Sequence, residues 1–136
     1  MNDAQQAAGI ALHDEMQPFH EAQGRQLTAV LSNDTGEGEE IFLAFGADAL
    51  IFRCNEDSDT IAVTFGPIPD LEDADDLTTD PAWSRFLGKE FFWGWLMLNQ
   101  QGYTDGALLS FDGVVPEVGL NVVAAAFEVL EIRQRA

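Results

Sequence analysis

The chain has 136 residues, and its 24 Asp and Glu against six Lys and Arg give a formal net charge of −18. This length suits a single domain over residues 1–136, and a hydrophobic share of 46%, with ten Phe and three Trp, is too high for a disordered acidic tail. The charge argues against nucleic acid and anionic membranes as partners, because both would repel it, and no apolar run reaches the roughly 18 residues of a membrane-spanning helix.

The first predicted element is a helix over residues 3–17, a stretch rich in Ala and Gln. Asn2 or Asp3 can cap its start, and Pro18 is expected to end it. An apolar residue at every fourth position gives this helix one modest apolar face.

Short strands are predicted next. One covers residues 26–32, and three further runs cover residues 41–45, 50–54 and 60–65. The last three are separated by tight polar loops that contain Gly, Asn and Asp. Connections this short pair neighbouring strands antiparallel, so these runs are expected to form a β-meander.

The segment GPIP ends the meander, and the most acidic stretch of the chain, DLEDADDLTTD, follows it. Pro81 then opens a predicted short helix over residues 82–87. Asp80 or Thr79 is a suitable N-terminal cap, and Gly88 closes the helix.

The strongest strand pattern covers residues 89–99, with the sequence KEFFWGWLMLN. Alternation divides its apolar side chains between two faces, one of which is formed by Phe91, Trp93, Trp95 and Met97. Because both faces are apolar, this strand is expected to be central and covered on both sides. Gly94 leaves space on the second face for a helix or an aromatic ring to approach closely.

Residues 99–102 (NQQG) are predicted to turn the chain into a partner strand over residues 103–111. The stretch 119–135 is ambiguous: its apolar spacing and three alanines fit a helix, whereas its valines and its alternation favour a strand, and a strand is expected. The predicted fold class is α+β, with a mostly antiparallel sheet of about six or seven strands, an N-terminal helix, and a short helix before the central Trp-rich strand.

The residues that could carry catalysis or hold a metal lack the required spacing. The chain has no GxSxG motif, and its cysteine has no sequence-supported base beside it. The carboxylates at 70–80 lack the glycine and the glutamate of an EF-hand loop, and His13 and His20 lack the HExxH spacing of a zinc site. We therefore expect a non-enzymatic protein without a metal or another cofactor.

Cys54 is the single cysteine, so an internal disulfide is excluded and a reducing, cytoplasmic location is expected. It lies in an apolar run and is predicted to be a small buried hydrophobic residue. The neighbouring Arg53 should point to the opposite face of the strand.

The negative charge is concentrated in the middle of the chain. Between positions 34 and 80 there are fourteen Asp and Glu and one basic residue, Arg53, and the acids gather in three predicted loops. Hairpins of similar length bring alternate loops to the same end of a sheet, so the first two loops could converge. The acids either keep the protein soluble as solvated turns or form a docking face for a basic partner. The candidate contacts of such a face are Asp70, Glu72, Asp73, Asp75, Asp76, Glu37, Glu39 and Glu40.

The tryptophans divide in a similar way. Trp93 and Trp95 lie in an apolar strand and are expected to pack in the core. Trp83 follows the acidic stretch directly and is the better candidate for partial exposure. Because Trp is enriched in interface hot spots, Trp83 is the predicted anchor of the docking face.

The segment GKEFFWGWLMLNQQGYTDGALLSF, with PAWSRFL before it and SDTIAVTFGPIP further upstream, resembles a pattern in small bacterial domains of unassigned function. Such domains are similar to those encoded beside secreted polymorphic toxins, where small acidic α+β proteins serve as immunity factors. The resemblance covers residues 39–132, and its motifs are structural. It therefore implies a toxin-neutralising binder but assigns no functional residue.

These observations predict a non-enzymatic acidic binding protein, an immunity-type inhibitor that covers the basic surface of a toxin such as a nuclease. Two alternatives remain open. A phage-encoded nucleic-acid mimic that inhibits a defence nuclease would have the same charge excess. A small ligand-binding or enzymatic domain would instead show a concave pocket with converging polar groups.

Overall fold

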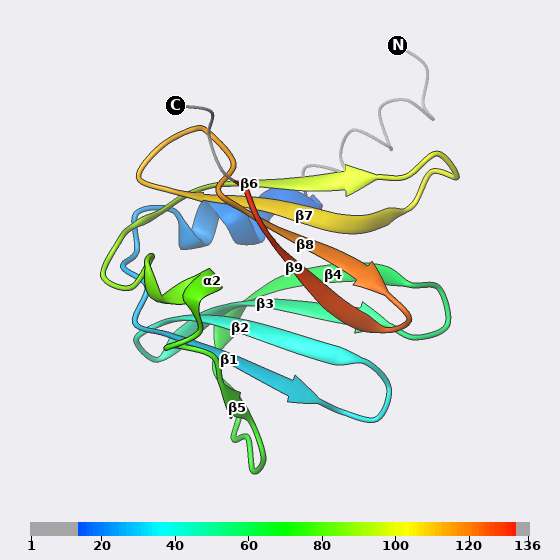
Figure 1. The fold of residues 1–136 in the computed structure, drawn as a ribbon, viewed down its shortest axis with the longest axis horizontal. Coiled ribbons are helices and arrows are strands. Elements are labelled where there is room, and N and C mark those ends of the chain that lie inside the picture. The colour runs from blue at the N-terminus through cyan, green and yellow to red at the C-terminus, as the bar shows by residue number, and fades with distance from the viewer. Residues whose placement is uncertain (1–13, 133–136) are drawn as a thin grey trace.

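Residues 14–132, which the computed structural model describes, form two antiparallel β-sheets that pack face to face (Figure 1). One sheet has five strands in the order β4-β3-β2-β1-β5, and the other has four in the order β6-β7-β8-β9. The mostly antiparallel fold is confirmed, but these nine strands form two sheets, whereas the sequence pattern predicts one sheet of about six or seven strands. Each sheet turns one face toward a shared core.

The five-stranded sheet is built from the predicted meander. β1 (Ala29–Asp34), β2 (Glu39–Phe45), β3 (Asp48–Asn55) and β4 (Thr60–Pro67) pair in chain order. β5 (Asp75–Asp76) adds two residues beside β1 at the edge of this sheet. The turns between β1 and β4 are short, which favours antiparallel pairing of consecutive strands.

The four-stranded sheet begins with the predicted hairpin, formed by β6 (Phe91–Leu98) and β7 (Thr104–Phe111). β8 (Val118–Val123) and β9 (Ala126–Glu131) then form a second hairpin from the stretch that the sequence predicts as one strand. The helical alternative for this stretch is therefore wrong. Its two-residue turn has no Gly or Asn to mark it in the sequence.

The core between the sheets is formed by alternate residues of their strands. In β3, the core-facing residues are Leu50, Phe52 and Cys54, and Arg53 lies on the opposite face. Both predictions for Cys54 and Arg53 are thus confirmed. Burial of each large apolar side chain contributes about 1.5–3 kcal/mol to stability. The other sheet supplies Phe91, Ala107, Leu109, Phe111, Val118, Leu120 and Val122.

Residues 14–22 are helical, and Phe19 extends from them into the core. Most of the predicted helix over residues 3–17 lies outside the described residues. The prediction that Pro18 ends this helix is wrong, because the chain stays helical to residue 22 and buries Phe19, a gain that offsets the backbone hydrogen bond lost at proline. The close approach predicted at Gly94 is confirmed: a Cβ at this position would overlap the Phe19 ring.

α2 (Pro81–Ser84) is a single helical turn before β6. The predicted Asp80 cap is confirmed, since its Oδ1 accepts a hydrogen bond of 3.0 Å from the Ala82 N–H. The predicted partial exposure of Trp83 is wrong: this side chain is 1% exposed, because the buried side of the turn carries it into the core. Within residues 14–132, the helices are too short or too polar to span a membrane.

β6 is an edge strand, so the prediction that it is central and covered on both sides is wrong. Its register with β7 shifts between Phe91 and Trp93, which leaves Phe92 as a bulged residue. A bulge reverses the alternation of faces, so that Phe91 and Gly94 are both buried while Trp93 and Trp95 lie on the outer side. Trp93 is 45% exposed and Trp95 is only partly buried, which overturns their predicted core packing.

Candidate functional site

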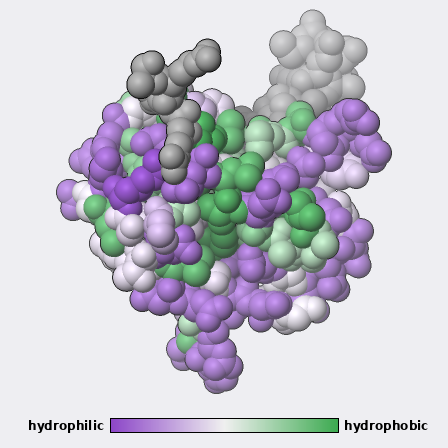
Figure 2. Space-filling model, in the orientation of Figure 1, coloured by the Kyte–Doolittle hydropathy of each residue, from purple (hydrophilic) through white to green (hydrophobic). Residues whose placement is uncertain are grey.

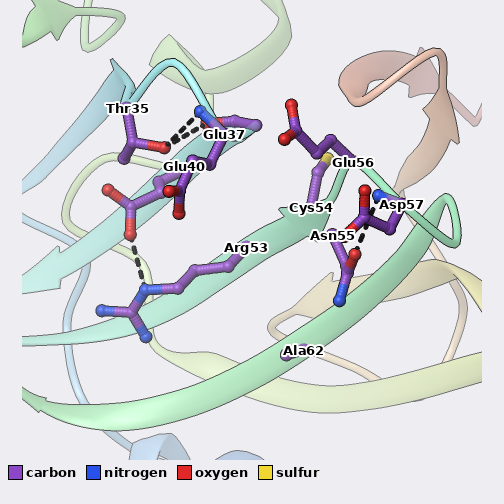
Figure 3. A pocket seen from close by; sticks show the side chains of 10 residues that line it. Thr35, Glu37, Glu40, Arg53, Cys54, Asn55, Glu56, Asp57 and Ala62 are labelled. Carbon is purple, nitrogen blue, oxygen red and sulfur yellow. Dashed lines mark hydrogen bonds and ion pairs between the residues drawn. The ribbon is translucent and has the colours of Figure 1, made fainter.

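The face of the five-stranded sheet turned away from the core, here called the outer face, carries a hollow lined by acidic side chains. We call this hollow, whose lining side chains are drawn in Figure 3, the acidic basin. Its volume is about 580 Å³. It lies between the β1–β2 turn and the β3–β4 turn, which are both on the right in Figure 1. The lining residues are Thr35, Glu37, Gly38, Glu40, Arg53, Cys54, Asn55, Glu56, Asp57 and Ala62.

The β1–β2 turn is held by its own polar side chains. The Thr35 hydroxyl donates to the Gly38 carbonyl at 3.1 Å and accepts from the Glu37 N–H at 3.1 Å. Gly38 has a φ of 140°, and a Cβ there would lie 2.5 Å from the Cys54 carbonyl oxygen, so this close approach between the β1–β2 turn and β3 requires glycine. The turn therefore presents the exposed Glu37 side chain from a defined backbone.

The β3–β4 turn is organised in a similar way. The Asn55 side-chain oxygen accepts a hydrogen bond of 2.9 Å from the Asp57 N–H, and the Asn55 carbonyl accepts one of 2.9 Å from the Asp59 N–H. An Asn side chain that bonds the backbone two residues on is typical of such turns. The carboxylates of Glu56 and Asp57 are left exposed at the rim of the basin.

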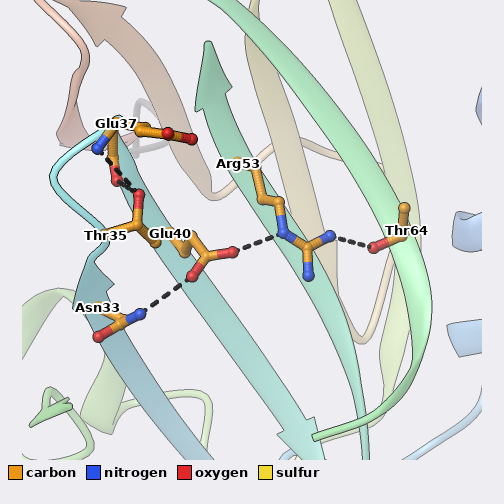
Figure 4. A network of polar contacts seen from close by, with 7 residues as sticks. Asn33, Thr35, Glu37, Glu40, Arg53 and Thr64 are labelled. Carbon is orange, nitrogen blue, oxygen red and sulfur yellow. Dashed lines mark hydrogen bonds and ion pairs between the residues drawn. The ribbon is translucent and has the colours of Figure 1, made fainter. Parts of the chain in front are cut away.

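A row of polar side chains crosses four strands on the outer face (Figure 4). The Asn33 amide donates to one oxygen of Glu40 at 3.1 Å, and the Arg53 guanidinium donates to the other. Arg53 also donates to the Thr64 hydroxyl at 3.0 Å. Glu40 is 12% exposed at its side chain and Arg53 is 41% exposed, so the ion pair is partly sheltered from solvent. Charge-assisted hydrogen bonds of this kind fix the side chains that make them.

The electrostatic balance of the acidic basin is negative. Its lining carries four carboxylates and one guanidinium, a net charge of −3. Because Arg53 is paired with Glu40, the unpaired charge comes from Glu37, Glu56 and Asp57 at the rim. Elsewhere in residues 14–132, Arg25 and Lys89 pair with Asp48 and Asp112, and Arg85 donates to a backbone carbonyl.

The first two predicted acidic clusters thus meet at one basin, as the alternation of hairpin turns predicts. Glu39 is an exception, because it lies on the core-facing side of β2. Its carboxylate accepts a hydrogen bond of 3.0 Å from the Phe127 N–H, and its backbone N–H donates to the Ala125 carbonyl at 3.0 Å. Asp59 likewise accepts from the Ala125 N–H at 3.0 Å. Both residues hold the β8–β9 hairpin against the five-stranded sheet.

The third predicted cluster covers residues 70–80, and its part from Asp70 to Asp76 borders the same outer face but does not line the basin, whereas Asp80 caps α2. Ile68 and Leu71 pack on a small apolar cluster around Phe42 and Ile51 on the outer face. This packing anchors the acidic segment to the sheet. Figure 2 shows this segment as a largely hydrophilic projection at the bottom of the molecule. The exposed acidic side chains of the segment are those of Asp70, Glu72, Asp73, Asp75 and Asp76.

Asp76 is the member of the third cluster with a defined local role. Its carboxylate accepts hydrogen bonds from Thr78, including one of 2.8 Å from the backbone N–H, and these hold the pKa of Asp76 below its ordinary value. Thr78 in turn accepts from the Val30 N–H at 3.0 Å. These bonds tie the acidic segment to the edge of the sheet beside β1.

Glu37 and Glu40 were predicted as contacts, but the pairing of Glu40 with Arg53 was not, although one signal for it was available. Glu40 and Arg53 are direct partners across β2 and β3. Counting outward from Gly46 and Ala47, in the short loop between the predicted strands 41–45 and 50–54, places them opposite each other. The Asn33 and Thr64 contacts depend on the registers of two further strand pairs.

The basin presents a negatively charged surface. Among the described residues, no group of three or more His, Cys, Asp and Glu is placed to hold a metal ion. Burial and the nearby charge of Glu39 raise the pKa of the Cys54 thiol to about 12, so this thiol stays protonated at neutral pH and is not a nucleophile. The basin can therefore attract a basic side chain through its rim carboxylates.

Comparison with known proteins places the chain by family. No curated protein and no solved structure matches it. One family does match, over residues 12–136, a range that includes both sheets and every residue of the acidic basin. The chain therefore belongs to the family described as "Family of unknown function (DUF6334)".

Proposed function

We propose that this protein is a non-enzymatic binding protein whose acidic basin receives the basic surface of a partner protein. The observation that carries this proposal is the convergence of two acidic turns on one hollow whose single cation is already paired with Glu40. Carboxylates arranged in this way steer a positively charged partner toward the site and reject negatively charged surfaces.

The organisation of the basin supports binding by a preformed surface. Its floor is the hydrogen-bonded row from Asn33 to Thr64, and its two rims are turns held by Thr35 and Asn55. A surface that is ordered before binding loses little conformational entropy when the partner arrives. The exposed acids of residues 70–76 border the same outer face and extend the negative field beyond the basin.

The kind of protein we propose is an immunity-type inhibitor that neutralises a basic toxin in a bacterial cytoplasm. Its support is the sequence resemblance to small acidic immunity proteins, together with the net charge of −18. If the toxin is a nuclease, the carboxylates of the basin would take the place of nucleic-acid phosphates in its basic cleft.

A labelled deca-lysine peptide tests the basin separately from the net charge. The basin variant Glu37→Gln/Glu56→Gln/Asp57→Asn removes the three unpaired carboxylates. The control variant Glu21→Gln/Glu128→Gln/Glu131→Gln removes three exposed acids on other surfaces, so both variants have the same net charge. Exposed charge pairs contribute about 0.2–1 kcal/mol each, so the basin variant should bind the peptide about tenfold more weakly than the wild type.

The control variant should bind within about threefold of the wild type, and added salt should weaken peptide binding to all three proteins. Fluorescence anisotropy at two ionic strengths measures both effects. Equal losses in the two variants would show that the peptide senses only the net charge, and the basin would then have no role as a docking site.

A further inference from the structure

The four edge strands of the two sheets differ in how well they are protected against pairing with strands of other chains. Exposed edges offer free backbone hydrogen-bonding groups to other chains, and native proteins block them with charges, proline or very short strands. β4 ends at Pro67, β5 consists of two aspartates, and β9 carries Glu128 and Glu131. β6 (FFWGWLML) has eight residues, no charge and no proline.

In the part of the chain that the structure describes, the free side of β6 is paired with another backbone segment only at its beginning, and the helix over residues 14–22 lines a hollow with Phe92, Trp93 and Gly94 farther along. Residues 24–27 run beside it there, with backbone hydrogen bonds of 2.9 Å from Leu27 to Lys89 and 2.8 Å from Gly24 to Phe91. Beyond Phe91, no other segment among residues 14–132 makes a backbone hydrogen bond to residues 92–98 on the side opposite β7. Among the described residues, this length of strand edge therefore has no pairing partner and can accept an added strand.

The side chains around this edge are apolar and exposed. Trp93 and Trp95 stack on the outer side with ring centroids 6.3 Å apart, and Trp93 is 45% exposed. Leu98, at the end of β6, is 60% exposed. Large exposed apolar side chains beside an unpaired strand mark an interaction surface.

We infer that β6 pairs antiparallel with β6 of a second copy of this chain, so that two four-stranded sheets join into one. The absence of charge on β6 favours a second copy over a basic partner at this edge. A basic partner would be attracted to the acidic basin and gains nothing at an uncharged strand, whereas two copies with a net charge of −18 repel each other least where their surface carries no charge. Antiparallel pairing of identical strands is two-fold symmetric, so the assembly closes at a dimer.

Sedimentation velocity of the full chain tests this inference with a matched pair of variants. Trp93→Lys places a charge on the β6 edge. Leu130→Lys places the same charge on β9, the other edge strand of this sheet, where Leu130 is 41% exposed. Two symmetry-related hot-spot residues are lost in the first variant, so its dimer dissociation constant should rise about 100-fold or more, whereas that of the second should stay within about threefold of the wild type.

Two further measurements keep the test independent of a folding defect and of the proposed function. Leu98→Lys, at a more exposed position of β6, should weaken the dimer in the same direction as Trp93→Lys. Added salt should strengthen the dimer, because it screens the repulsion between the copies, whereas it should weaken binding of the deca-lysine peptide at the basin. Failure of one effect is thus distinguishable from failure of the other.

A wild-type chain that is monomeric up to about 100 µM would overturn the inference. A monomer that dimerises only after removal of residues 1–13 would also overturn it, by showing that those residues cover β6. The same conclusion would follow from a dimer that salt weakens, from one that tolerates both β6 lysines, or from equal losses in the β6 and β9 variants.

Discussion

The turn between β8 and β9 offers a direct test of how this fold is held together. Ala124 and Ala125 have φ angles of 52° and 63°, in the left-handed region that disfavours residues with a Cβ. Two hydrogen bonds nevertheless hold the turn in place. The N–H of Ala125 donates to the Asp59 carboxylate at 3.0 Å, and the Ala125 carbonyl accepts from the Glu39 N–H at 3.0 Å. We predict that replacing the turn by Asn-Gly, which favours this backbone, stabilises the protein.

The expected gain follows from the two backbone conformations. Each alanine in the left-handed region costs about 1 kcal/mol, and Asn at position 124 with Gly at position 125 relieves most of both costs. The greater conformational freedom of glycine in the unfolded chain reduces this stabilisation by about 0.5–1 kcal/mol. The backbone groups that bond Asp59 and Glu39 are unchanged. The net increase in the free energy of unfolding should be about 1 kcal/mol, which corresponds to about 4 °C in Tm.

Urea denaturation followed by tryptophan fluorescence measures this change, with the slope of the transition as a check that the unfolded state is unaffected. Ala125→Gly and Ala126→Gly form a matched pair one residue apart. Ala126 lies in β9 without a positive φ, so glycine there should destabilise by about 0.5–1 kcal/mol, whereas glycine at 125 should not destabilise. Equal destabilisation by both substitutions would refute a left-handed turn at Ala125.

Three further predictions concern the core. Gly94→Ala should lower the free energy of unfolding by about 1–3 kcal/mol in urea denaturation, because the new Cβ overlaps the Phe19 ring; unchanged stability would place that ring elsewhere. At a protein concentration too low for dimerisation, Trp83→Ala should cost about 3–5 kcal/mol and Trp93→Ala less than about 1 kcal/mol in the same assay, since only the first side chain is fully buried. Equal costs would contradict the bulge in β6. The third prediction concerns pH: the native Cys54 thiol keeps its proton up to a pKa of about 12, whereas the unfolded thiol loses it near its ordinary value of 9.0, so the unfolded state binds fewer protons in this window and stability falls as pH rises through it. The stability of Cys54→Ala, measured over the same pH range, should lack this component, and parallel curves for the two proteins would contradict the buried state of the thiol.

The proposed roles of the two sheets are separate. The five-stranded sheet carries the acidic basin on its outer face, and the four-stranded sheet carries the uncharged edge of β6. A dimer formed through β6 would leave the basin of each copy open, because the two features belong to different sheets. Two basins in one assembly would allow a partner with two basic sites to be held more tightly than by a single copy.

The sequence by itself determined the elements that depend on residues close together in the chain. β2, β3 and β4 each contain the predicted strand run, and the polar turns between them made antiparallel pairing the expected outcome. The Asp80 cap and the space above Gly94 were likewise predicted, because each depends on residue type at one position. The convergence of the first two acidic loops followed from hairpin geometry alone.

The tertiary structure decided the features that depend on pairing between distant segments. One bulged residue at Phe92 reverses every following face of β6, so the alternation read from the sequence placed Trp93 and Trp95 on the wrong side. The Ala124-Ala125 turn has no local signal, and the contacts that support it come from Glu39 and Asp59, more than sixty positions earlier in the chain. Side-chain periodicity specifies which residues alternate, but only the partner strand determines where that alternation is interrupted and which side faces the core.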